Sequence, residues 1–376
     1  MDLEVKPSSP PNHRTLPSEI IHQILSYFCI QDLSTLSDCS LVSRQFNGIA
    51  TPLLWRWLYL KPPTTIHTEQ DAQEPSHQTK TENWTVDLLK HVKILSISTH
   101  QENWCAHSKI ISLPNLEVLR LKVHSELSGR SEYHHELNFG QPEHDPQPCP
   151  LVKNLKPKVI IWERTGYSSL CLDEAPSLPT SVWSHVETLI FLASSIDAGT
   201  RHTRCNFSLP KEIPKLKKIY WIYDPVSTYR DEEVHWSDQE PFWSSIPKLD
   251  TWVLLNVILR SPRCDIDIVN LRSTVLRRRH LRDSFTETQK LMKIQILNEM
   301  GYELEGAMDQ DFIIPKDMKY CSEHLSFLSM AEFIAEKDAR GWFEPFEVRA
   351  WQDAMYEAES GTEEEREKMH DQSLKE

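Results

Sequence analysis

Apolar residues recur with a helical period near the start of the chain, between residues 16 and 60. A spacing of four residues places side chains on one face of a helix, so the pattern predicts an amphipathic helix. Pro17 suits the first helical position, and Glu19 follows close to the positive helix end. The stripe consists of Leu16, Ile20, Ile24 and Phe28, and it is widened by Ile21 and Leu25.

Three further capping signals follow, so we expect four short helices in this segment. Asp32 can cap a second helix, Ser40 a third, and Thr51-Pro52 can open a fourth that reaches Tyr59. So short a bundle buries too little apolar surface to be secure alone. Much of that surface should therefore face another protein or the next domain. The alternative is an ordinary helical hairpin that packs on its own domain.

The segment resembles an F-box, and in detail the F-boxes of fungal proteins. The order and spacing of four motifs carry this resemblance. They are Leu16-Pro17-Ser18-Glu19-Ile20, Asp32-Leu33, Val42-Ser43-Arg44-Gln45-Phe46 and Leu54-Trp55. The resemblance implies that the module binds the Skp-type linker of SCF (Skp-cullin-F-box) ubiquitin ligases. The positions that match the linker-contacting residues of the family are Leu16, Pro17, Ile20, Ile24, Leu25, Leu33, Val42 and Phe46.

A short phrase, apolar-x-x-apolar-x-apolar, recurs through the rest of the chain. Alternating apolar residues predict a strand with one buried face. The recurrence resembles an irregular leucine-rich-repeat array with long insertions. We therefore expect an α/β fold: a small helical F-box module followed by a leucine-rich-repeat-like solenoid. The alternative is a non-repeat α/β domain. The phrases begin at Val92, Leu116, Val186, Leu216 and Leu249, with a weaker one at Val159.

Composition shifts suggest where one part of the chain ends and the next begins. The expected parts are a disordered leader (1–14), the F-box (15–60), a linker (61–83), a substrate-binding domain (84–356) with an inserted loop (125–150), and an acidic tail (357–376).

Two charged or aromatic segments near the C-terminus have more than one interpretation. The basic cluster in residues 271–282 could bind an acidic or phosphorylated partner or direct nuclear import, or it could be a solvated surface. Residues 286–300 have the spacing of an amphipathic helix. Beyond them, the aromatic residues between Phe333 and Trp351 are expected to cap the open end of the core, as terminal repeats do.

Composition favours an intracellular protein, cytoplasmic or nuclear. The net charge of −14 disfavours nonspecific binding to nucleic acid. No apolar run approaches the roughly 20 residues of a membrane span. The eight cysteines are scattered, so we expect reduced thiols. Cys149 and Cys105-x-His107 do not provide the paired spacing of a zinc site, so no metal or other cofactor is expected.

Two functions from different classes remain open. In the first, the chain is a substrate-recruiting adaptor of an SCF-type ligase, which binds the linker, and through it a cullin, and presents an unknown protein for degradation. In the second, it is a non-catalytic F-box scaffold that acts outside a ligase. No local catalytic signature is present, so an enzyme is a weaker third possibility.

Overall fold

The computed structural model divides into two compact units, Met1–Arg56 and Trp57–Glu376. The structure describes residues 16–31, 33–60, 86–98, 100–101, 105, 112–124, 133–134, 149–165, 178–193, 213–225, 264–270, 324–336 and 339–360.

The N-terminal unit consists, in its described part, of three helices rather than the four expected. They are α1 (Ser18–Gln31), α2 (Leu33–Val42) and α3 (Arg44–Leu54). The predicted fourth helix is wrong, because α3 runs on through Pro52 and the chain then becomes extended. Residues Trp57–Leu60 form strand β1, in which Leu58 and Leu60 are buried and Tyr59 is exposed. This alternation has the period of a strand, not of a helix.

The cap of α3 also differs from the prediction. The backbone N–H of Phe46 donates to the Ser43 side chain at 3.2 Å, which makes Ser43 the N-cap. The hydroxyl of Ser40 instead donates to the carbonyl of Ser37 at 2.6 Å, within α2.

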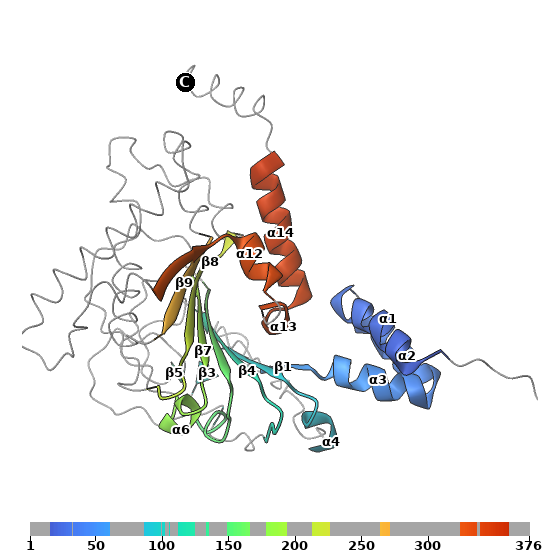
Figure 1. The fold of residues 1–376 in the computed structure, drawn as a ribbon. Coiled ribbons are helices and arrows are strands. Elements are labelled where there is room, and N and C mark those ends of the chain that lie inside the picture. Colours follow the sequence, from blue (N-terminus) through green and yellow to red (C-terminus); the bar gives the residue numbers. More distant parts are fainter. Residues whose placement is uncertain are drawn as a thin grey trace, which may run out of the picture. The chain divides into compact units, whose positions relative to one another are not determined.

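The second unit is built on a sheet whose eight described strands are all parallel. The order of the strands across the sheet is the same as their order along the chain (Figure 1). The α/β class is therefore as predicted. The strands are β1 (Trp57–Leu60), β2 (Ile94–Ser98), β4 (Val118–His124), β6 (Val159–Thr165), β7 (Thr188–Ala193), β8 (Lys218–Tyr223), β9 (Asp265–Val269) and β10 (Leu325–Leu328).

Five of the apolar phrases fall on β2, β4, β6, β7 and β8, so these strand predictions are confirmed. Strands β9 and β10 were not anticipated. The remaining elements are the short pair β3 (His100–Gln101) and β5 (Tyr133–His134), which is antiparallel, and the helices α4 (Val86–Leu89), α6 (Thr180–Trp183), α12 (Met330–Ala335), α13 (Ala339–Trp342) and α14 (Pro345–Ser360).

One hydrogen-bond arrangement recurs where the strands begin. The carbonyl of Lys93 accepts from the N–H groups of Glu117 and Val118, at 2.8 and 2.9 Å. The carbonyls of Glu117, Lys158 and Glu187 each accept two N–H groups from the following strand in the same way. Each strand is thereby held in a fixed register to the one before it.

The side chains at these positions alternate in charge. Lys93 pairs with Glu117 at 2.7 Å, and Lys217 pairs with Glu187 at 2.7 Å. The hydrogen bond from Lys217 lowers the pKa of the Glu187 carboxyl. These pairs are largely exposed, so each contributes little free energy, but opposite charges directly across a sheet favour this register over a shifted one.

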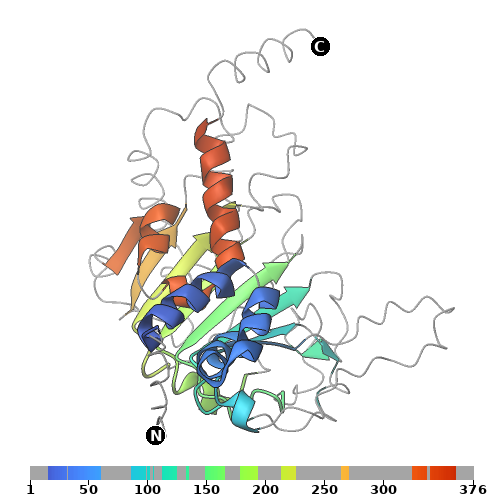
Figure 2. The same cartoon turned by 90° about the vertical axis from the view of Figure 1, so that its right-hand side faces the viewer.

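Both faces of the sheet are covered, which explains why strands such as β2 and β8 are buried almost throughout. One face packs on α4, α6 and the described turns before β2, β4, β6, β7 and β8, in a cluster that includes Leu119, Ile160 and Trp183. The other face packs on α12, α13 and α14, in a cluster that includes Ile161, Tyr220 and Phe333. Figure 2 shows α14 in front of the strands.

The aromatic residues near the C-terminus cover this second face of the sheet, and the prediction that they cap the open end of the core is wrong. The ring of Tyr220 in β8 makes edge contacts with Phe333 and Trp342, at 5.1 and 6.0 Å between centroids. The Tyr220 hydroxyl donates to Glu336 at 2.6 Å, and the indole N–H of Trp351 donates to Asp224 at 3.0 Å. The strands offered a second apolar face, and the C-terminal helices bury it.

A fully buried arginine joins the sheet to α14. Arg120 of β4 is 0 % exposed and donates to both oxygens of Glu347 and to Glu163, all at 2.6 Å. Burial alone would lower the pKa of Arg120, but the hydrogen bonds and charges of the two carboxylates more than offset it and raise the pKa. The rings of Trp57 and Phe343 lie against the guanidinium, with their centroids 5.5 and 5.7 Å from its Cζ atom.

Several predicted segments lie outside the described residues. They are the leader, the linker 61–83, most of the insertion 125–150, the phrase at Leu249, the basic cluster 271–282, the helix 286–300 and the acidic tail beyond Ser360. Among the helices that the structure describes, none is long and apolar enough to cross a membrane.

Replacing Arg120 with methionine should destabilise the second unit strongly. The change leaves Glu163 and Glu347 without their shared cation while they are only 17 % and 15 % exposed. Loss of one partner of a buried pair typically costs about 3–5 kcal/mol. Thermal unfolding followed by tryptophan fluorescence measures the loss. Lys93→Met, which breaks an exposed pair, is the control and should cost less than about 1 kcal/mol; equal losses in the two variants would contradict the assigned role of Arg120.

Candidate functional site

The first helix of the N-terminal unit has apolar residues on two sides. Ile21 and Leu25 point into the unit and are 2 % and 0 % exposed. Ile20 and Ile24, one turn apart, are 41 % and 45 % exposed. Leu16, which lies just before the helix, is 55 % exposed as well. The helix therefore presents an exposed apolar stripe, defined by Leu16, Ile20 and Ile24.

The second helix adds exposed apolar residues at both of its ends. Leu33 is 60 % exposed at the beginning, and Val42 is 69 % exposed at the end. Beside Val42, Leu41 is 81 % exposed and was not among the predicted contact residues. Only Leu36, in the middle of α2, is fully buried. An excess of apolar residues on solvent-facing positions of so short a helix indicates a surface that another molecule covers.

The described core of this unit is small, which accounts for the exposed residues. Four apolar side chains are fully buried, and the rest of the cluster is only partly covered. The fully buried members are Ile21, Leu25, Leu36 and Ala50; the partly buried ones are Phe28, Cys39, Phe46, Ile49, Leu53 and Leu54.

Polar contacts hold α3 against the start of α1 and against α2. The side-chain amide of Gln45 donates to the carbonyl of Leu16 at 3.4 Å and to the hydroxyl of Ser18 at 3.2 Å. The amide of Asn47 donates to the carbonyl of Ser40 at 3.1 Å. Because Leu16 precedes the helix, the bond from Gln45 helps to fix the position of the exposed stripe.

The electrostatic character of the segment suits burial of apolar surface. From Leu16 to Val42 the sequence contains no lysine or arginine, and its acidic residues are Glu19, Asp32 and Asp38. A partner that covers the stripe therefore has few charges to remove from water, and basic residues around its rim would complement the acids.

The eight predicted linker-contacting residues divide by exposure. Six of them are exposed: Leu16, Pro17, Ile20, Ile24, Leu33 and Val42. Phe46 is partly buried, and Leu25 is completely buried in the unit's own core. Leu25 cannot touch a partner without rearrangement, so its place in this site is to support α1 from beneath.

The structure also brings together three residues that sequence spacing kept apart. His100, Cys105 and Cys149 are all buried, and their nitrogen and sulfur atoms lie within 4.8 Å of one another. Short-range spacing alone could not reveal this group, because Cys149 comes from a different connection of the second unit than His100 and Cys105.

Comparison with known proteins identifies the N-terminal segment. Residues 13–61 match the F-box-like family. Comparisons with curated proteins and with solved structures gave no match. The chain thus contains an F-box-like domain, which supports the predicted F-box resemblance, and the match includes all eight predicted contact positions.

The inward and outward sides of α1 should respond differently to truncation. Leu25→Ala opens a cavity in a four-residue core and should cost about 2–5 kcal/mol. Ile24→Ala removes a half-exposed side chain and should cost less than about 1 kcal/mol. The rate of protease cleavage within residues 18–54 of the otherwise folded chain reports opening of this unit. The assignment of the two sides fails if Ile24→Ala is cleaved as fast as Leu25→Ala.

Proposed function

We propose that this chain, which carries an F-box-like domain at residues 13–61, is the substrate-recognition adaptor of an SCF-type ubiquitin ligase. F-box domains generally bind Skp-type linkers and are typically non-catalytic adaptor modules. In this proposal the linker connects the chain to a cullin, and the second unit holds a protein destined for degradation. Other subunits transfer the ubiquitin, and this chain supplies proximity, which lowers the entropic cost of that transfer.

The observation that carries the proposal is the exposed apolar stripe on α1 within the segment that matches the F-box-like family. We propose that Leu16, Pro17, Ile20 and Ile24 contact the linker, together with Leu33 and Val42 from α2. Complete burial of a leucine or isoleucine contributes about 1.5–3 kcal/mol, so covering these half-exposed side chains gives roughly half of that each. Phe46 contacts the linker with its exposed part, and Leu25 keeps α1 in place.

For the second unit we propose a degenerate leucine-rich-repeat-like domain. Eight parallel strands in chain order, with a described turn before each of β2, β4, β6, β7 and β8, support this proposal, since stacked repeats contact only their neighbours. Solenoid domains commonly bind partners on the open face of such a sheet. Here α12, α13 and α14 cover the face around β6 to β8. We therefore propose that the substrate is bound by the turns, the connections or the outer surface of these helices, in the cytoplasm or the nucleus.

Truncating the exposed stripe should weaken binding to a purified Skp-type linker. The combined change Leu16→Ala, Ile20→Ala and Ile24→Ala removes apolar area that only the complex buries, and we expect a loss of affinity of at least about tenfold, equal to about 1.4 kcal/mol. Isothermal titration calorimetry on the full chain measures it. Gln23→Ala, an exposed polar position on the same helix, is the matched control and should bind as tightly as the original chain. Unchanged affinity in the triple variant would contradict the proposed interface.

The same variants separate the ligase adaptor from a scaffold that acts outside a ligase. Affinity capture of the full chain from cells treated with a proteasome inhibitor should recover the linker together with a cullin. Both should be lost with the triple variant and retained with Gln23→Ala. Recovery of the linker without any cullin would support the scaffold and contradict the adaptor role.

A further inference from the structure

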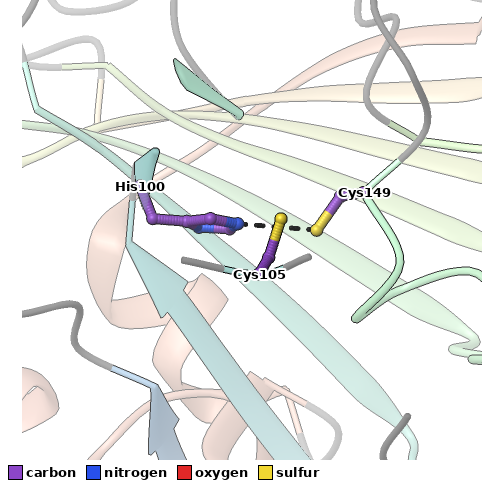
Figure 3. A group of neighbouring side chains, drawn as sticks. All are labelled: His100, Cys105 and Cys149. Atoms are coloured by element: carbon purple, nitrogen blue, oxygen red, sulfur yellow. Dashed lines mark hydrogen bonds between the residues drawn. The ribbon is translucent and has the colours of Figure 1, made fainter. Parts of the chain in front are cut away.

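The group of His100, Cys105 and Cys149 lies inside the second unit, away from any surface. His100 is 1 % exposed, and Cys105 and Cys149 are both 0 % exposed. Figure 3 shows the imidazole ring and the two thiols directed toward a common point. The two cysteines belong to the apolar cluster on the α4 and α6 side of the sheet. Three metal-ligating side chains therefore converge in surroundings that are otherwise largely apolar.

The imidazole of His100 is oriented as a ligand requires. Its Nδ1 atom lies 2.9 Å from the carbonyl of Ser98. Because a carbonyl can only accept, Nδ1 donates a proton to it, and Nε2 is the ring atom whose lone pair can bind a metal. Nε2 is the atom that faces the sulfurs, 3.5 Å from Sγ of Cys149. A histidine that donates one ring nitrogen to a carbonyl while presenting the other is the usual arrangement around a protein-bound metal.

The charges that the three side chains can supply would balance those of a divalent cation. A divalent ion that displaces both thiol protons leaves two thiolates, one neutral imidazole and a site with no net charge. A neutral site is compatible with an apolar core, whereas two unpaired thiolates are not.

We propose that His100, Cys105 and Cys149 bind a zinc ion. Two sulfurs and one imidazole form a ligand set that zinc favours, and a fourth position remains for water or another small ligand. His100 follows β2 and Cys149 precedes β6, so the ion ties together two connections that flank β4. The site would stabilise the sheet around β4. The connection between β4 and β6 is the longest of those that join the successive strands from β2 to β8.

Metal content of the full chain tests this proposal directly. The chain is produced in zinc-supplemented medium, because a sealed site is loaded most readily during folding, and is purified with a reductant. We expect about one zinc ion per chain, the stoichiometry of a single site. Cys149→Ser and Cys105→Ser should each weaken zinc binding by more than the roughly 10- to 100-fold that loss of an outer partner causes. Cys264→Ser is the matched control, since Cys264 is also buried but lies outside the group, and should retain the ion.

A second measurement on the unaltered chain guards against variants that fail to fold. Cobalt in place of zinc should give the intense absorption of thiolate-to-metal charge transfer. Zinc-loaded chain should also have two more of its eight cysteines protected from a thiol reagent than chain treated with a chelator. A chain that holds no zinc, zinc that survives the loss of both cysteines, or a cobalt spectrum without charge transfer would overturn the proposal.

Discussion

The described core of the three-helix unit, with its four fully buried apolar side chains, leaves the outer side of the first helix uncovered. Leu25 lies on the inner side of α1 and completes the core, so Ile20 and Ile24, on the outer side, remain in water. The chain uses leucine and isoleucine where a solvated helix would have polar residues. We propose that a second polypeptide supplies the missing half of the core.

The second unit buries its apolar surface within itself. Its parallel strands are apolar on both faces, and α12 to α14 cover the face that the turns leave open. Arg120 shows how complete this covering is, since its guanidinium is fully buried and neutralised by Glu163 and Glu347. The first unit thus has exposed apolar surface, whereas the described sheet of the second unit is covered on both faces. This contrast is why we assign linker binding to the first unit.

Sequence periodicity was sufficient where a local pattern decides the structure. The apolar phrases located five strands, and the stripe from Leu16 to Phe28 located α1. Periodicity failed where tertiary packing decides. Arg120 occupies a position that alternation alone would expose, and only the docking of Glu347 from 227 residues away makes its burial tolerable. The aromatic residues after Phe333 gave no indication of which surface they would meet.

The candidate site was predictable to a similar extent. Motif order identified the F-box-like segment, but it could not separate Leu25, which faces inward, from Ile24, which faces outward, because both positions are apolar in one broad stripe. Likewise, the burial of Leu58 and Leu60 in a sheet depends on β2, which pairs with them from beyond residue 93. The sequence analysis considered Cys105 and Cys149 and found no zinc spacing, because Cys149 meets His100 and Cys105 only after the sheet has formed.

Hydrogen–deuterium exchange of the full chain, with and without a purified Skp-type linker, tests the central claim most directly. The account predicts slower exchange on linker binding in α1 and α2, with no change in the strands of the second unit. Binding that leaves exchange in residues 18–42 unchanged, or that protects only the sheet, would contradict it.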